Sequence, residues 1–140
     1  MREEVSSGGV VLFGNAILLL KKYNGDWVLP KGKIKKDENK WQAALREVYE
    51  EGRVKGEIID YIDNIKYSFK NCWNNHEVVE KTVHWYLMKT KSMNCAPLKE
   101  EGFIEARFVH MNRALSMIKY DDERLIVKKV LDILESRGKL

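Results

Sequence analysis

The apolar residues of this chain gather in short β-rich runs over its first two thirds and in a helical stripe near its C-terminal end. Runs rich in Val, Ile, Leu and aromatic residues, bounded by Gly, Asn or Pro, predict strands. The strand candidates are residues 5–13, 16–23, 27–29, 58–69, 78–88 and 105–110, with turns at 14–15 and 24–26 and a polar loop at 71–77. Pro30 ends the third run, and we expect a lysine-rich loop from there to Asn39.

Three segments carry helix signals instead. The candidates are residues 39–52, capped by Asn39 with Gln42 as its capping-box partner; 113–118, capped by Asn112; and 121 to about 136, capped by Asp121 or Asp122. Leu125, Val130 and Leu134 belong to an apolar stripe on the last helix, which indicates core packing. This order of elements predicts the α+β class, a mixed sheet with helices packed on it.

The composition indicates a globular protein rather than a disordered or fibrous one. The chain has 140 residues, 44% hydrophobic and 33% charged, and no low-complexity tract, so we expect one domain over residues 1–140. A net charge of +4 is too small by itself to indicate nucleic-acid binding. The longest apolar stretch, residues 8–20, is too short to span a bilayer and does not resemble a signal peptide. We therefore expect a cytoplasmic protein without membrane attachment.

Cysteine and histidine do not indicate a metal site. Cys72 and Cys95 form no Cys-x-x-Cys pair, and the three histidines are scattered. The segment from His76 to Glu80 superficially resembles a zinc-protease helix, but it lacks the second His and lies in a strand-like stretch. Two isolated thiols fit a reducing compartment.

Glu47, Glu50 and Glu51 share one face of the predicted helix 39–52, because residues three and four apart are neighbours at about 100° per residue. Their repulsion is relieved either by solvation of the whole face or by a hard cation such as Mg²⁺ or Mn²⁺. Arg46 is placed one turn before Glu50 and can pair with it. The residues expected to pack on the sheet are Trp41, Ala44, Leu45, Val48 and Tyr49.

The spacing around these carboxylates resembles the box that defines the Nudix family. Gly32, five residues, Glu38, seven residues, Arg46-Glu47-Val48-Tyr49-Glu50-Glu51 and Val54 match eight of the nine specified positions over residues 32–54. The departure is Arg53, where the family usually has a Gly that ends the helix in a left-handed conformation. Gly52 comes one place earlier.

This resemblance implies a Nudix-type α/β/α sandwich with a mixed β-sheet, and hydrolysis of a nucleoside diphosphate linked to another group. It implies metal ligation of Mg²⁺ or Mn²⁺ by Glu47, Glu50, Glu51 and the backbone carbonyl of Lys31, with Arg46 and Glu38 orienting and bracing the helix. Glu47 is the candidate general base. Lys31 and Lys33 would add positive charge near the phosphoryl group.

A carboxylate outside the box often completes such a site in this family. Glu101, with Glu100 or Glu105 as substitutes, lies at the expected place before the strand that contains Phe108. An exposed acidic loop is the other interpretation of these residues, and the sequence leaves both open.

Further features within and beyond the box are Trp41-Gln42-Ala43-Ala44, Lys81, Tyr86 and Tyr120. By these residues the chain is similar to one branch of the family, the asymmetric diadenosine tetraphosphate hydrolases. That resemblance implies phosphate contacts by Lys31 and Lys81, and stacking of an adenine on Tyr120 and Tyr67. A small nucleotide is therefore the expected partner, with oligomeric state left open.

The sequence leaves other substrates open for the same chemistry. The lysine-rich loop is compatible with RNA 5′ ends or a diphosphoinositol polyphosphate, and an oxidised nucleoside triphosphate is a further candidate. A nucleotide sensor without turnover is the alternative from another class. The complete set of Glu47, Glu50 and Glu51 argues against that alternative.

Overall fold

A seven-stranded mixed sheet forms the centre of the protein, in a computed structural model that describes residues 2–73 and 75–138. Asn74, in the expected loop 71–77, lies outside these residues. The order is β3-β2-β1-β6-β5, with β4 beside β1 and β7 beside β2, and β1 runs parallel to β6 while the other pairs are antiparallel. The strands are β1 (Arg2–Phe13), β2 (Ala16–Lys22), β3 (Trp27–Val28), β4 (Lys31–Lys33), β5 (Glu57–Asn71), β6 (Glu77–Lys89) and β7 (Phe103–His110).

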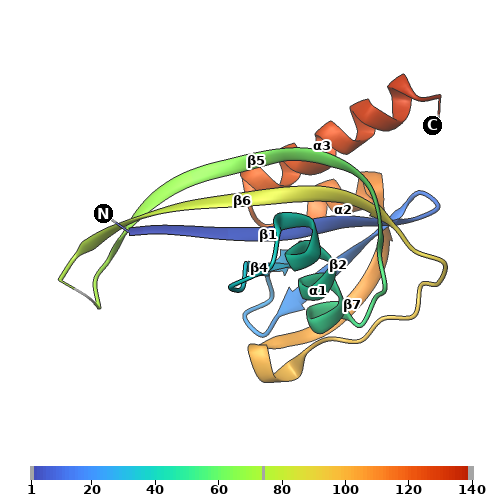
Figure 1. The fold of residues 1–140 in the computed structure, drawn as a ribbon. Coiled ribbons are helices and arrows are strands. Elements are labelled where there is room, and N and C mark those ends of the chain that lie inside the picture. Colours follow the sequence, from blue (N-terminus) through green and yellow to red (C-terminus); the bar gives the residue numbers. More distant parts are fainter. Residues whose placement is uncertain (1, 74, 139–140) are drawn as a thin grey trace.

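Helices cover both faces of this sheet (Figure 1). α1 (Lys40–Gly52) packs on one face, where Val48 belongs to a buried cluster with Met88 of β6. α2 (Met111–Met117) and α3 (Asp121–Ser136) pack on the other face, where Val130 shares a cluster with Leu87. Successive strand residues point to opposite faces, so neighbouring positions of β6 serve the two clusters. The expected α+β sandwich is confirmed. Within residues 2–73 and 75–138, no helix is long and apolar enough to cross a membrane.

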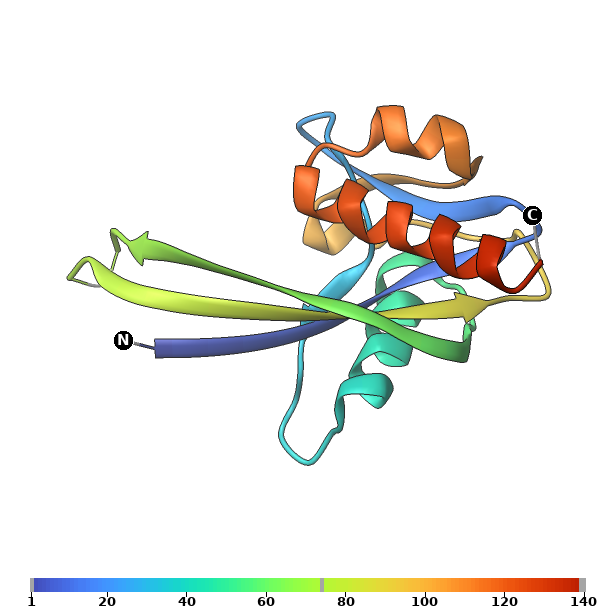
Figure 2. The same cartoon turned by 90° about the horizontal axis from the view of Figure 1, so that it is seen from above.

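β5 and β6 form a long antiparallel hairpin, paired from Glu57 opposite Lys89 to Asn71 opposite Glu77. Both strands run beyond the expected bounds of 58–69 and 78–88. Figure 2 shows that the far end of this hairpin, together with the start of β1, projects beyond the rest of the fold. In its register Tyr67 lies opposite Lys81, and directly paired residues share a face of the sheet.

The prediction of a loop after Pro30 is wrong for residues 31–33, which form β4. β4 pairs antiparallel with β1, and Gly8 lies opposite Lys31. A Cβ at Gly8 would lie 2.4 Å from the Pro30 carbonyl oxygen and 2.7 Å from the Lys31 Cβ, so glycine permits this close approach. The pairing is short and joins strands distant in sequence, and no local pattern predicts it.

α2 starts two residues earlier than expected, and its cap is also different. The helix begins at Met111, and His110 is the N-cap. The His110 Nδ1 accepts the backbone N–H of Asn112 at 3.3 Å, so Asn112 receives a cap instead of providing one.

α3 ends at Ser136 as predicted, but its N-cap is Tyr120 rather than an aspartate. No side chain caps the helix there. Asp121, Asp122 and Glu123 all lie in the first turn, where negative charge is stabilised by the helix dipole without a cap bond.

α1 begins as the sequence predicts and ends in an unusual way. The Asn39 side chain accepts the Gln42 N–H at 2.9 Å, and the Gln42 side chain accepts the Asn39 N–H at 3.0 Å. At the other end Arg53 is left-handed, with φ 57° and ψ 33°, and donates its N–H to the Tyr49 carbonyl at 2.8 Å. Its guanidinium lies 5.4 Å from the Tyr49 ring centroid, a cation–π contact that offsets part of the backbone strain.

Two substitutions at this helix end separate the backbone strain from the cation–π contact. Arg53→Ala and Arg53→Gly both remove the contact, but only glycine adopts a positive φ without steric cost. We expect R53G to be more stable than R53A by about 0.5–1 kcal/mol, measured by urea unfolding. Equal stabilities would show that Arg53 carries no backbone strain.

Candidate active site

Two carboxylates of α1 point into the protein rather than into solvent. Glu47 is 9% exposed and Glu51 is 5% exposed, in the same buried stripe as Ala43, Ala44 and Val48. Glu50 lies nearer the solvent, with 40% of its side chain exposed. The small alanine side chains let the helix lie close to the sheet, and Glu47 and Glu51 face β4.

This orientation corrects the expected packing arc of α1. Ala44 and Val48 are buried as predicted, but Trp41 and Tyr49 are 46% and 40% exposed. The helix is rotated so that the carboxylate face, not the aromatic side, meets the neighbouring strands. Helical periodicity gives relative positions around the axis, and it does not set which arc turns inward.

Arg46 connects the acidic residues of the site. Its Nε and Nη2 donate to the two carboxylate oxygens of Glu38 at 2.7 and 2.9 Å. Its Nη1 donates to Glu47 at 2.6 Å and to Glu50 at 3.2 Å, and Nη2 also donates to the Lys33 carbonyl at 2.9 Å. One guanidinium thus ties α1 to the chain before it, as a planar fork can and a lysine cannot.

The Arg46 contact has opposite electrostatic consequences for its two partners. Its hydrogen bonds hold the pKa of Glu38 at about 2, below the ordinary value of 4.5. The pKa of Glu47 is raised, because burial outweighs the same guanidinium. Glu38 therefore acts as a permanently charged brace, whereas Glu47 is a buried carboxylate with a higher proton affinity.

Glu51 faces the strand β4 from the end of α1. Its Oε1 accepts the backbone N–H of Lys31 at 3.0 Å. Burial, and next the charge of Glu47, raise the pKa of Glu51 to about 8, and Glu101 adds to the effect. At Gly32 a Cβ would lie 2.1–2.5 Å from the Glu47 carboxylate atoms. At Gly32 the strand therefore approaches the Glu47 carboxylate more closely than any side chain would allow.

These carboxylates have the donor chemistry that a hard divalent cation prefers. Buried like-charged oxygens raise one another's pKa, and a cation between them would remove that penalty. Among the described residues, no group of three acidic, histidine or cysteine side chains is arranged closely enough to hold a metal ion by itself. Mg²⁺ fits such a partial set, because it keeps several waters and shares its remaining positions with substrate phosphates.

Glu101 is brought to this site by a loop that docks on the end of α1. The N–H groups of Ala96 and Leu98 donate to the carbonyls of Gly52 and Glu51 at 3.0 and 3.1 Å. The turn η1 (Lys99–Glu101) follows directly, and Glu101 raises the pKa of both Glu47 and Glu51 by its charge.

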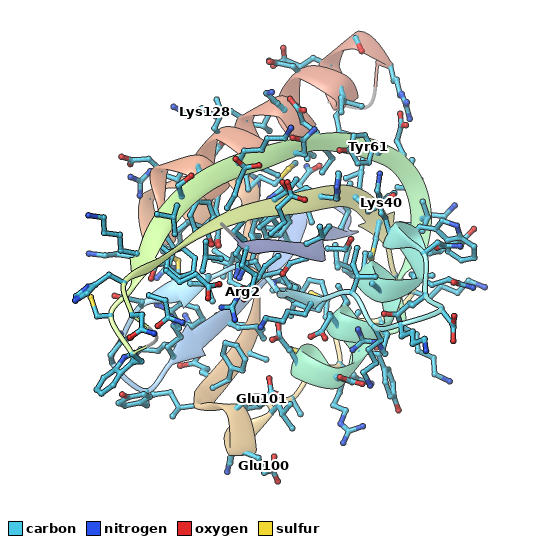
Figure 3. All side chains as sticks on the ribbon, turned by 60° about the vertical axis from the view of Figure 1, so that its left-hand side comes forward. Arg2, Lys40, Tyr61, Glu100, Glu101 and Lys128 are labelled. Atoms are coloured by element: carbon cyan, nitrogen blue, oxygen red, sulfur yellow. The ribbon has the colours of Figure 1, made fainter. Side chains whose placement is uncertain are left out.

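The two substitutes for Glu101 lie elsewhere. Glu100 is exposed, and Figure 3 shows it at the outer end of the turn, with Glu101 nearer the sheet. Glu105 is held on β7 by Arg107, whose Nε donates to it at 2.9 Å. Of the three candidates, the structure brings Glu101 to the carboxylates of α1.

A cavity of about 490 Å³ opens beside Glu51. Two of the tyrosines singled out in the sequence line it, Tyr67 from β5 and Tyr120 from the start of α3, and each is about 40% exposed. The Lys22 ammonium lies 5.9 Å from the Tyr120 ring centroid. The lining residues are Lys22, Val28, Leu29, Lys31, Glu51, Ile65, Tyr67, Val83, Trp85, Phe103, Tyr120, Asp122 and Glu123.

Lysines gather on the same side of the sheet. Lys81 is half-buried, and burial followed by the charge of Lys31 lowers its pKa. Lys33 is more exposed and pairs with Glu4 at 3.2 Å. Tyr86 is not part of this group, because it packs edge-on against Tyr61, with ring centroids 5.2 Å apart, on the α1 side of the sheet.

The cavity also contains two residues that the sequence analysis did not single out. Glu123 is 3% exposed and accepts the Leu29 N–H at 2.9 Å, and burial raises its pKa to about 7. Trp85 of β6 is 1% exposed. A signal for Glu123 was present, since it falls on the buried stripe of α3 with Ile126 and Val130.

The site thus combines buried carboxylates on one helix, an arginine that positions them, and an adjoining cavity lined by lysines and tyrosines. The NUDIX domain family model matches residues 4–130. The chain therefore belongs to the NUDIX family, and its domain is that of a pyrophosphohydrolase.

Individual relatives differ in the substrates their names suggest. The chain is 33% identical over 117 residues to a Mycobacterium tuberculosis protein assigned the name mutator protein MutT4, a match covering 80% of this chain but only 45% of that protein. It is 30% identical to an RNA pyrophosphohydrolase of Wolbachia pipientis, covering 91% of this chain and 87% of that protein. It superposes on a C. elegans Ap4A hydrolase with a TM-score of 0.72 at 20% identity, covering 95% and 98% of the chains. This last likeness shows the fold.

The Glu38–Arg46 bridge gives a testable link between pH and stability. Because the folded-state pKa of Glu38 lies near 2, below its ordinary 4.5, its contribution is fully present above about pH 5 and disappears as the pH falls toward 2. We expect Glu38→Gln to lower the free energy of unfolding by about 1.5–3 kcal/mol at pH 7, and by less at pH 3. Glu57→Gln, at an exposed carboxylate, is the control. If Glu38→Gln lowers the free energy of unfolding as much at pH 3 as at pH 7, this explanation is contradicted.

Proposed function

We propose that this protein cleaves a pyrophosphate bond in a dinucleoside polyphosphate such as diadenosine tetraphosphate, using Mg²⁺ or Mn²⁺. The observation that carries the proposal is the cavity beside Glu51, where Lys31 lies on the lining together with Tyr67 and Tyr120. A ligand with phosphates near Lys31 could stack a base on either ring.

The acidic residues of α1 would hold the metal. The proposed ligands are Glu47, Glu50, Glu51 and the backbone carbonyl of Lys31, with Glu101 completing the set. A bound divalent ion neutralises phosphate oxygens and lowers the pKa of a coordinated water. Glu47 is the proposed general base, since its raised pKa favours accepting a proton from the attacking water.

The remaining residues of the proposed site position these groups or the substrate. Arg46 fixes the rotamers of Glu47 and Glu50 through its hydrogen bonds, while Glu38 fixes Arg46. Lys31, Lys33 and Lys81 add positive charge along the path of the phosphates. Because Lys33 is already paired with Glu4, we assign it a smaller part than the other two lysines.

RNA 5′ ends are the second candidate substrate. The observation that favours them is the Wolbachia relative, an RNA pyrophosphohydrolase matched over most of its length. The projecting hairpin offers a place for further nucleotides, since the Phe69 ring lies next to Tyr67, with centroids 6.3 Å apart, and is 41% exposed. Aromatic rings on such a surface stack bases with little regard to sequence.

We also propose a cytoplasmic location with a nucleotide as the partner. Cys72 and Cys95 are both free thiols. Thiols persist in a reducing compartment, which supports this location.

The proposal predicts a defined cleavage pattern. Diadenosine tetraphosphate with Mg²⁺ should release ATP and AMP, measured by chromatography of the products. Glu50→Gln should reduce kcat by at least about 100-fold, because it removes a charged ligand while leaving the fold intact. Glu135→Gln, at an exposed carboxylate of α3, is the matched control and should retain activity.

Two results would count against the proposal. One is no cleavage of the dinucleotide by the wild-type protein at saturating Mg²⁺. The other is a wild-type rate in E50Q. Faster turnover of a 5′-triphosphorylated RNA than of the dinucleotide would favour the second candidate.

A further inference from the structure

Glu4 of β1 lies on the same face of the sheet as the cavity. Side chains alternate between the two faces along a strand, and Val10 of β1 shares a buried cluster with Val83 and Trp85, which line the cavity. The register of β1 with β6 is continuous from Arg2 to Leu12, so Glu4, an even number of residues before Val10, points to the same side. Its side chain is 14% exposed, which makes Glu4 a largely covered acidic group close to the lysines of the site.

Three basic side chains lie beside this carboxylate. The Glu4 Oε2 is 3.2 Å from the Lys33 Nζ and 3.3 Å from the Arg2 Nη2. Lys81 is the direct neighbour of Glu4 in the register of β1 and β6. Burial, and then the charge of Lys31, lower the pKa of Lys81, and the charge of Glu4 opposes them. Glu4 therefore occupies the position of an anion among these cations.

Arg2 is restrained by a second carboxylate as well. Its Nε lies 3.3 Å from the Glu77 Oε1, so its guanidinium bridges two acidic residues. Arg2 therefore has less positive charge to offer a ligand than the lysines have.

The lysines form a path that begins at the carboxylates of α1 and ends at Glu4. Lys31 donates its N–H to Glu51 at 3.0 Å, and its side chain lines the cavity. The charges of Lys31 and Lys81 act on each other, and Lys81 lies next to Glu4. A polyphosphate held between the two lysines would meet positive charge along its first phosphates and a carboxylate beyond them.

We infer that Glu4 limits the number of phosphates that the site accepts. This inference rests on the proposed function and narrows its substrate class to polyphosphates of limited length. An additional phosphate competes with the Glu4 carboxylate for Lys33 and Lys81, and it is also repelled by that carboxylate. Each phosphate beyond the first few therefore adds little to binding.

A purely structural role of Glu4 has a different consequence. If Glu4 only held Lys33 and Arg2 in position, its replacement would weaken the binding of every polyphosphate to the same degree. Glu4→Gln removes the charge and keeps an oxygen that accepts hydrogen bonds from both cations. A limit on phosphate number is thus measured as a change in the dependence on chain length, and a positioning role as a uniform loss.

The kinetic test compares diadenosine tetraphosphate with diadenosine hexaphosphate in the wild-type protein and in E4Q. The ratio of kcat/KM for the hexaphosphate to that for the tetraphosphate should rise by about tenfold or more in E4Q, because the two added phosphates no longer meet a negative charge. Glu3→Gln is the matched control, since Glu3 is the preceding residue of β1, is exposed and points to the opposite face. E3Q removes the same charge and should keep the wild-type ratio. An unchanged ratio in E4Q, or an equal rise in E3Q, overturns the inference.

A binding measurement separates this inference from the proposed activity. ADP, ATP and adenosine 5′-tetraphosphate are titrated calorimetrically without metal into the wild-type protein and E4Q. In E4Q each added phosphate should tighten binding by a factor about threefold larger than in the wild type. That result supports the limit on phosphate number even if no dinucleotide is cleaved, in which case only the proposed function fails. A dependence on phosphate number that is the same in both proteins, including a uniform loss in E4Q, overturns the inference.

Discussion

The burial of Glu47 and Glu51 against β4 is the constraint on which the rest of the site depends. Two carboxylates within a protein repel one another and lose hydration, and their raised pKa values express both costs. The fold compensates with the Arg46 guanidinium, the Lys31 N–H and the missing side chain of Gly32. A divalent cation between these carboxylates would relieve both costs.

The cavity beside this arrangement is lined by both basic and acidic side chains. Lys22 and Lys31 line it together with Glu51, Asp122 and Glu123, and the charges of Lys31 and Lys22 offset part of the rise that burial causes in the pKa of Glu123. Tyr67 and Tyr120 reach the same space from the hairpin and from the start of α3.

Residues 32–54 follow the pattern of the NUDIX family, but the end of α1 differs because Arg53 stands where the family usually has glycine. Arg53 takes the left-handed conformation that glycine would adopt at lower cost, and the Tyr49 ring lies within reach of its guanidinium. The next loop docks on the carbonyls of Glu51 and Gly52. That docking brings Glu101 near the buried carboxylates.

The sequence by itself determined the features that depend on local spacing. The capping box at Asn39, the proximity of Arg46 to Glu50, the first hairpin and the end of α3 follow from residues close together in the chain, where geometry is nearly fixed by periodicity and turn chemistry. Only the tertiary structure decided the rest. Which arc of α1 turns inward, the pairing of β4 with Gly8, the choice of Glu101 and the burial of Glu123 all depend on segments distant in sequence. Such contacts are selected by packing across the whole fold, and no local pattern contains that information.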